Sequence, residues 1–228
     1  MDKRLAAKLR GVGFFSELTD EEILSLGDRV RLELFPKGAV ILSGAEANER
    51  MYAVIEGEVK AYVNSADGRE TVLAIRGAGQ SFGELALIDG KTAPAEVAAT
   101  TESLVALISK ADFLDLLSSN KMVLLYFLRL MCERLREAWG MQEILHLRDA
   151  SERVRRLFAK FAEERGKPLQ DGETLIEVRL THQQVADLTA LTRETVTRVI
   201  DQMKRDGLLR LRNDRLYVLS KDFFSDRN

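Results

Sequence analysis

Two arginines and a glutamate lie close together in residues 193–198, at the start of a segment with helical spacing. An arginine fork can donate two hydrogen bonds to guanine O6 and N7, and a glutamate can accept one from cytosine N4. Four residues are therefore candidates for reading DNA bases: Arg193, Glu194, Thr197 and Arg198. The alternative is a solvated helix face with ordinary ion pairs, so the neighbouring elements must decide.

Those neighbours predict two short helices joined by a tight turn. Thr181 and Gln184 have the spacing of a capping box, Thr192 can cap the second helix, and Gly207 is expected to stop it. The predicted apolar stripes consist of Val185, Leu188, Val196, Val199, Ile200 and Met203. This pattern favours a helix-turn-helix whose second helix enters the major groove. Three polar residues are predicted to hold phosphates without reading sequence: Thr181, Gln183 and Thr192.

The rest of the C-terminal part fits a winged helix. An amphipathic helix is expected from Ser151 to Phe161, and it is ended by Gly166-Lys-Pro168. A short strand follows at residues 174–178, and residues 207–219 alternate around an Asn213-Asp214 turn, which predicts a β-hairpin wing. We therefore expect a winged-helix DNA-binding domain over residues 149–228.

The N-terminal part has a different pattern of apolar residues and glycines. Residues 1–28 read as short helices, whereas short β-rich runs separated by glycines extend from Arg29 to Leu107. One such run is expected from Val97 to Leu107, and residues 66–69 carry a hairpin signal. Many short strands predict a small antiparallel roll or barrel. The expected fold class is α+β, with a β-roll domain over residues 1–110.

A long helical pattern connects the two parts over residues 111–148, with a break predicted near Asn120. Positions 117, 121, 124, 128, 131, 135, 138, 142 and 145 step by four and three residues, and seven of the nine are apolar. The predicted dimer seam consists of Leu124, Leu128, Met131 and Leu135. We favour a two-chain coiled coil over a helix that packs only within its own chain, since a small roll cannot cover so much apolar surface.

Composition excludes several classes of protein. The chain has 228 residues, of which 46% are hydrophobic and 31% charged, as in globular proteins. The single cysteine, Cys132, excludes a disulfide framework and is expected to be a small core residue. No signal peptide or apolar run of membrane length is present, so we expect a cytoplasmic protein with no membrane partner. Residues 151–228 have a net charge of +3 and residues 1–150 of −5, which supports DNA binding only weakly.

The segment from Gly77 to Gly90 is the second one that suggests chemistry. Backbone amides near Gly83 can approach a ligand, and Glu84 can accept a hydrogen bond from a hydroxyl such as a ribose 2′-OH. Phe82 occupies the position of the third glycine in a dinucleotide-binding fingerprint, so the sequence does not favour a dinucleotide-binding site here. A turn with a capping carboxylate is the simpler alternative.

Together, several ordered motifs resemble the CRP/FNR (cyclic-AMP receptor / fumarate-nitrate-reduction regulator) superfamily. They are Lys37-Gly38, Gly44, the Tyr52–Val59 run, Gly68, Gly79, Phe82-Gly-Glu-Leu-Ala-Leu87 and Arg193–Arg198. The resemblance covers nearly the whole chain. It implies that residues 1–110 are an effector-sensing β-roll of cyclic-nucleotide-binding type, followed by a long dimerisation helix and a C-terminal winged helix-turn-helix.

The departures from that pattern concern the effector. Members that bind cyclic AMP hold its phosphate with an Arg-Ser or Arg-Thr pair, whereas this chain has Lys91-Thr-Ala-Pro-Ala95. The adenine-binding Thr-Ser pair falls at Ala138-Trp139, where Trp139 either closes the pocket or packs at the junction. The predicted effector pocket consists of Phe82, Gly83, Glu84, Leu85, Ala93, Pro94, Ala138 and Trp139. We expect a small effector other than cyclic AMP, and no metal. The N-terminus has no cysteines for an iron–sulfur cluster, and haem is not expected because the two histidines, His146 and His182, lie at the end of the long helix and in the DNA-binding domain.

The sequence therefore predicts a homodimeric transcription factor that binds a palindromic promoter site under effector control. Its expected partners are double-stranded DNA, a second copy of the chain and RNA polymerase. The alternative is a ligand-binding module that regulates a protein partner. An enzyme is not expected, because no catalytic triad, metal-spaced cluster or phosphate loop with a catalytic lysine is visible.

Overall fold

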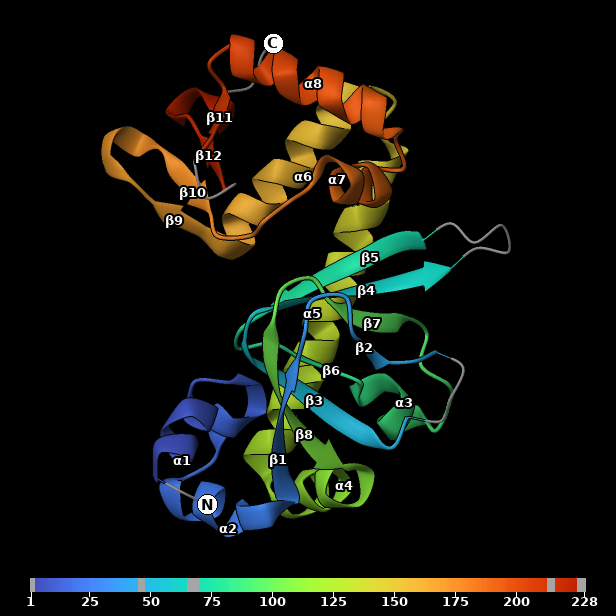
Figure 1. Cartoon of the computed structure of the whole chain (residues 1–228), viewed down its shortest axis with the longest axis vertical. Helices are drawn as coiled ribbons and strands as arrows, with labels where there is room; N and C mark the ends of the chain where they lie inside the picture. The colour runs from blue at the N-terminus through green and yellow to red at the C-terminus, as the bar shows by residue number, and fades with distance from the viewer. Residues whose placement is uncertain (1–2, 45–47, 65–69, 213–215, 225–228) are drawn as a thin grey trace. The chain divides into compact units, whose positions relative to one another are not determined.

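The computed structural model describes residues 3–44, 48–64, 70–212 and 216–224 (Figure 1). The chain divides into two compact units, Met1–Arg134 and Leu135–Asn228, and the division falls within one long helix. The predicted turns at residues 66–69 and at Asn213-Asp214 lie outside the described residues. Among the described helices, none has the length and apolarity needed to span a bilayer.

The first unit begins with short helices, as predicted: α1 (Lys3–Arg10), a 3-10 turn η1 (Gly13–Glu17), α2 (Asp20–Leu26) and η2 (Gly27–Arg29). Thr19 accepts a hydrogen bond from the Glu22 amide, and the Glu22 carboxylate accepts one from the Thr19 amide, so α2 starts with a capping box. Phe14 and Phe15 are fully buried, so η1 is packed into a hydrophobic core of this unit.

Two antiparallel sheets follow and form the predicted roll (Figure 1). The first has the order β1 (Val30–Phe35), β8 (Ser103–Ser109), β3 (Arg50–Glu56), β6 (Ser81–Phe82). The second has the order β2 (Val40–Leu42), β7 (Glu96–Ala99), β4 (Glu58–Asn64), β5 (Glu70–Gly77). The expected single run from Val97 to Leu107 is wrong. It forms two strands, because Ala99 pairs with Val59 in one sheet while Ser103 pairs with Phe35 in the other.

The roll has two apolar cores. The inner one includes Val54, Val59, Phe82, Val97 and Val105. The outer one packs the helices against the first sheet and includes a cluster of aromatic rings. Within it, the ring centroids of Phe113 and Phe127 are 4.9 Å apart in an edge-to-face arrangement, a favourable geometry for aromatic pairs.

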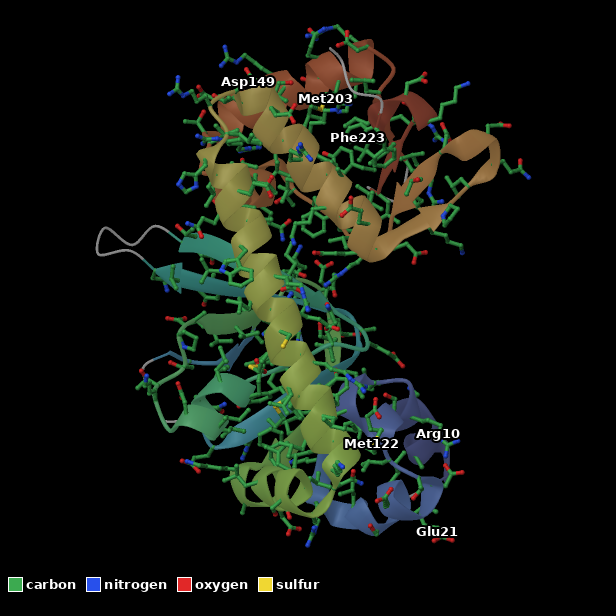
Figure 2. The ribbon with its side chains drawn as sticks, turned by 180° about the vertical axis from the view of Figure 1, so that it is seen from behind. Arg10, Glu21, Met122, Asp149, Met203 and Phe223 are labelled. Carbon is green, nitrogen blue, oxygen red and sulfur yellow. The ribbon has the colours of Figure 1, made fainter. Side chains whose placement is uncertain are left out.

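Three helices complete the roll: α3 (Glu84–Asp89), α4 (Lys110–Ser119) and α5 (Lys121–His146). The predicted break at Asn120 is confirmed. Its side-chain oxygen accepts hydrogen bonds from the amides of Met122 and Val123, at 2.9 and 3.1 Å, and so caps α5. Met122 therefore lies in the first turn of α5 (Figure 2).

The second unit contains α6 (Ala150–Arg165), β9 (Gly166–Pro168), η3 (Gln170–Gly172), β10 (Thr174–Ile176), α7 (His182–Thr189), α8 (Arg193–Arg205), β11 (Leu209–Leu211), β12 (Tyr217–Leu219) and η4 (Lys221–Phe224). Its sheet has the order β11-β12-β10-β9. Helix α6 ends before Gly166-Lys-Pro168, as predicted. These three residues form strand β9, which pairs with β10. Met203 and Phe223, labelled in Figure 2, are buried in the core of this unit.

Candidate DNA interface and effector site

The helix-turn-helix is built by local capping. Thr181 accepts a hydrogen bond from the Gln184 amide at 3.1 Å, and the Gln184 side chain accepts one from the Thr181 amide at 2.8 Å. This confirms the predicted capping box at the start of α7. The turn after α7 places Ala190 at φ 53°, in the left-handed region. Thr192 then accepts from the Thr195 amide at 3.2 Å and caps α8, which we call the recognition helix.

The recognition helix buries Val196, Ile200 and Met203, as predicted, whereas Val199 is only half-buried. Val199 lies at the edge of the apolar stripe, because 3.6 residues per turn rotate it away from the other three. Arg193, Glu194 and Arg198 are exposed, and Glu194 and Arg198 lie opposite the apolar stripe.

The exposed charges at the start of α8 are not satisfied by the protein itself. Within the described residues, the side chains of Arg193 and Glu194 form no hydrogen bond or ion pair. The guanidinium of Arg198 reaches Thr195 Oγ1 at 3.5 Å, and Thr192 donates to the same oxygen at 2.9 Å. Thr195 is a polar neighbour of Arg198 that sequence reasoning missed, although its spacing of three residues was a usable signal.

Thr197 differs from the other candidates because its hydroxyl has partners within the protein. It donates to the main-chain oxygen of Arg193 at 2.9 Å and lies 2.9 Å from Nδ1 of His182. Only acceptor capacity remains for a base. Sequence reasoning missed His182, because a contact between residues 182 and 197 has no local signal.

The three predicted phosphate contacts lie at the N-terminal ends of the two helices. Thr181 and Thr192 are N-caps, so their hydroxyls are oriented by backbone amides. Gln183 is exposed and donates from Nε2 to Asp187 Oδ1 at 2.8 Å. Free N–H groups at a helix start attract anions, which suits this position.

In the roll, Gly83 is required by packing. Its φ is 92°, and an added Cβ would lie 2.9 Å from Tyr52 Cδ2 and 3.0 Å from Asn48 Nδ2. Asn48 also donates to the Gly83 carbonyl at 2.7 Å. These contacts explain the glycine without a ligand.

Glu84 is bound by a residue that the sequence analysis left outside the pocket. Its side chain is 1% exposed, and Oε1 lies 3.3 Å from a guanidinium nitrogen of Arg134 on α5. The other oxygen, Oε2, is buried and has no hydrogen-bond partner in the described structure. Arg134 also donates to the Ser81 carbonyl at 2.5 Å. Arg134 follows Phe127 by two helical turns on the buried face of α5, a spacing that was visible in the sequence.

Of the remaining predicted pocket residues, Phe82 and Ala93 belong to the same buried cluster of the roll. Phe82 is buried and stacks on Tyr52, with ring centroids 4.9 Å apart. Ala93 is buried, whereas Leu85 and Pro94 are exposed. On α5, Ala138 is exposed and the Trp139 side chain is 60% exposed.

The predicted seam lies on an open face of α5. Leu128 and Leu135 are 54% and 50% exposed, Leu124 is also exposed, and Met131 is half-buried. The adjacent face, about a quarter-turn away, buries Val123 and Phe127. The expectation that Cys132 is a core residue is wrong within one chain, because Cys132 is exposed beside the seam.

Comparison with known proteins links both parts to one group. The cyclic nucleotide-binding domain family matches residues 32–120, and the Crp-like helix-turn-helix domain family matches residues 152–223. The cyclic AMP receptor protein of Thermus thermophilus is 29% identical over 204 residues, which are 89% of this chain and 90% of that protein. The CRP-like cAMP-activated global transcriptional regulator of Mycobacterium tuberculosis is 25% identical over 228 residues, or 100% and 99% of the two chains.

Solved structures agree on the fold. FixK2 from Bradyrhizobium japonicum has a TM-score of 0.72 at 23% identity, covering 83% of this chain and 92% of that one. The c-di-GMP responsive regulator CLP of Xanthomonas campestris has a TM-score of 0.71 at 23% identity, covering 89% and 99%. The predicted combination of roll, long helix and helix-turn-helix is confirmed.

Proposed function

The chain belongs to the CRP/FNR superfamily of transcription regulators, and we propose that it acts as a homodimer on a palindromic DNA site under control of a small effector. The superfamily assignment makes it a DNA-binding regulator with a ligand-binding domain and not an enzyme. The observation that carries the finer proposal is the start of α8. Arg193 and Glu194 there are exposed and make no side-chain hydrogen bond or ion pair within the described residues.

The roles of the site residues follow from that exposure. Arg193 and Arg198 each favour a guanine, Glu194 favours a cytosine on the opposite strand, and Thr197 contributes an acceptor. Thr181, Gln183 and Thr192 hold phosphates and set the register. The winged-helix domain of residues 149–228 carries these roles, and residues 1–110 and 111–148 sense the effector and form the dimer.

Selection of bound sequences from random double-stranded DNA tests this function. We expect recovered sites with two-fold symmetry and half-sites about one helical turn apart, roughly 34 Å. Recovery of asymmetric sites would contradict the palindromic dimer. Failure to retain any DNA would favour the alternative, a module that regulates a protein partner.

The open face of α5 supports the dimer. An exposed row of large apolar side chains is costly in water and marks an interaction surface. The row repeats every three and four residues, which is the pattern of a coiled coil. A second copy of the same helix supplies a matching surface, and RNA polymerase is the expected further partner of the bound dimer.

The effector site supports a ligand with a hydrogen-bond donor. Glu84 Oε2 is a buried acceptor without a partner in the described structure, and a hydroxyl or ammonium group would satisfy it. Cyclic AMP also needs a bidentate cation for its phosphate. Residues 91–95 contain no arginine, and Pro94 has no amide hydrogen to donate.

Cyclic AMP is therefore expected to leave the protein unchanged, although several relatives are named as cAMP-activated. Adding it at physiological concentration should neither raise the melting temperature nor strengthen binding to the selected DNA. Thermal unfolding and isothermal calorimetry check this. Micromolar binding by calorimetry would show that the pocket holds a cyclic phosphate without the arginine.

A further inference from the structure

The imidazole of His182 touches the recognition helix through one hydroxyl group. Nδ1 lies 2.9 Å from Thr197 Oγ1, and the same hydroxyl is 2.9 Å from the main-chain oxygen of Arg193. A carbonyl oxygen only accepts, so the single hydroxyl proton of Thr197 is used there. Nδ1 must then carry the proton of the bond to Thr197. Nε2 is the ring nitrogen whose protonation changes the charge of His182.

The free protein disfavours that charge. Burial, followed by the nearby cation of Lys204, lowers the pKa of His182; Asp201 opposes this, and Arg193 adds to it. These three charged groups all belong to α8 and are the ones that face the ring. The imidazole is therefore neutral at neutral pH, with Nδ1 as donor and Nε2 as acceptor. A neutral Nε2 cannot donate to a phosphate.

DNA reverses the electrostatic balance at this place. Double-stranded DNA carries one negative charge for about every 1.7 Å of its axis. His182 lies between Thr181 and Gln183, and its partner Thr197 lies between the exposed side chains of Arg193 and Arg198. Phosphates bound at this surface stabilise an imidazolium, because their negative charge offsets its repulsion from Lys204 and Arg193.

We propose that DNA binding is coupled to proton uptake at His182, whose Nε2 takes a proton from solvent, keeps it and donates a hydrogen bond to a phosphate oxygen. Thr197 is the positioning residue that fixes the tautomer and keeps Nε2 free for this task. The inference rests on the proposed binding of DNA by α7 and α8. Affinity for DNA then rises as the pH falls.

This dependence runs opposite to the effect of His182 on folding. Because its pKa is lowered in the folded state, its contribution to stability is complete above its ordinary pKa and is lost as the pH falls. General damage by acid would weaken folding and DNA binding together. Only a proton taken up on binding makes DNA affinity increase while the melting temperature of the free protein decreases.

Histidine NMR gives a direct readout, since the chain has only two histidines, His146 and His182. With ¹⁵N-labelled histidine and a double-stranded DNA of selected sequence, we expect His182 to be the Nδ1–H tautomer when free. We expect its pKa to rise on DNA binding. His146, which contacts the Gln142 carbonyl at 2.7 Å on α5, is the internal control and should not shift. An Nε2–H tautomer, or an unchanged His182 titration, would overturn the proposal.

Affinity measurements use matched variants at constant ionic strength between about pH 8 and pH 6. Each unit by which DNA raises a pKa is a tenfold gain in affinity per protomer, so we expect the wild type to gain about three- to tenfold. His182→Asn keeps a donor for Thr197 but cannot titrate, so its affinity should match the wild type near pH 8 and stay flat. His146→Asn should keep the full gain.

Thr197 is tested in the same assay. Thr197→Ser keeps the hydroxyl and should retain the pH response, whereas Thr197→Val removes it and should reduce the response. A wild-type affinity independent of pH, or a full response in His182→Asn, would overturn the proton uptake while leaving the DNA-binding function intact. Absence of DNA binding at every pH would instead contradict the proposed function.

Discussion

Replacing Leu128 and Leu135 by lysine is expected to convert the dimer into folded monomers. Both side chains are half-exposed in the single chain, at 54% and 50%, so lysines there stay in water when the chain is alone. In a two-chain seam, the same substitutions bury four ammonium groups against each other. Burying unpaired charges costs several kcal/mol, more than a helical seam of this length can offset.

Sedimentation velocity measures this change directly. The double variant should sediment as a monomer with an unchanged circular dichroism spectrum. Glu133→Lys is the matched control, because it adds the same two units of positive charge to an exposed position of α5 outside the predicted seam. The control should remain a dimer. A double variant that still sediments as a dimer would place the interface elsewhere.

Loss of the dimer should also abolish tight binding to the palindrome. Two linked domains bind neighbouring half-sites with an avidity that can exceed either affinity by about 10²–10⁴. We therefore expect at least a hundredfold weaker binding, on the order of that gain, while the weak binding of each recognition helix persists. Equal binding by monomer and dimer would contradict the two-fold site.

Local rules were sufficient to predict the elements that present the DNA interface. The caps at Thr181 and Thr192 both form as their spacing predicted, because a capping hydrogen bond joins residues three apart. The break at Asn120 is of the same kind. Each of these features depends only on residues within one helical turn, so the local sequence is sufficient to predict it.

Contacts between distant segments were not predictable from such rules. The split of the run from Val97 to Leu107 depends on which sheet each strand joins, and only the partner strands β4 and β1 decide that. The ion pair between Glu84 and Arg134 joins residues 50 positions apart in the sequence. Each of the two residues could be noticed in the sequence, but nothing in the sequence indicated that they form a pair.

The same limit applies to the roles of individual side chains. Gly83 was expected to let a ligand approach, and the structure adds a packing requirement, because Tyr52 and Asn48 exclude a side chain there. Thr197 was expected to read bases, and the structure adds that its hydroxyl donates to the main-chain oxygen of Arg193. The neighbours of Gly83 come from other parts of the roll, whereas the main-chain oxygen that accepts the Thr197 proton belongs to the same helix, α8.

The second large effect concerns Arg198. Arg198→Ala should weaken binding to the preferred site by about 1–3 kcal/mol per half-site, which is roughly 5- to 150-fold, because a bidentate contact to guanine is lost. The preference should relax at one base pair of each half-site and remain at the others. Selection from random DNA with the variant, together with titrations on single-base substitutions, measures both effects.

Two further variants separate reading of bases from general attraction. Arg205→Ala removes the same charge two turns further along α8, where the guanidinium donates to Gln202 at 2.6 Å, and it should leave base preference unchanged. Gln183→Ala should weaken all sequences about equally, because a phosphate contact carries no sequence information. If Arg198→Ala kept its full base preference, or if Gln183→Ala changed it, the division of roles between α8 and α7 would be wrong. Because an arginine fork can donate two hydrogen bonds to guanine O6 and N7, the preference lost with Arg198 should be for a guanine.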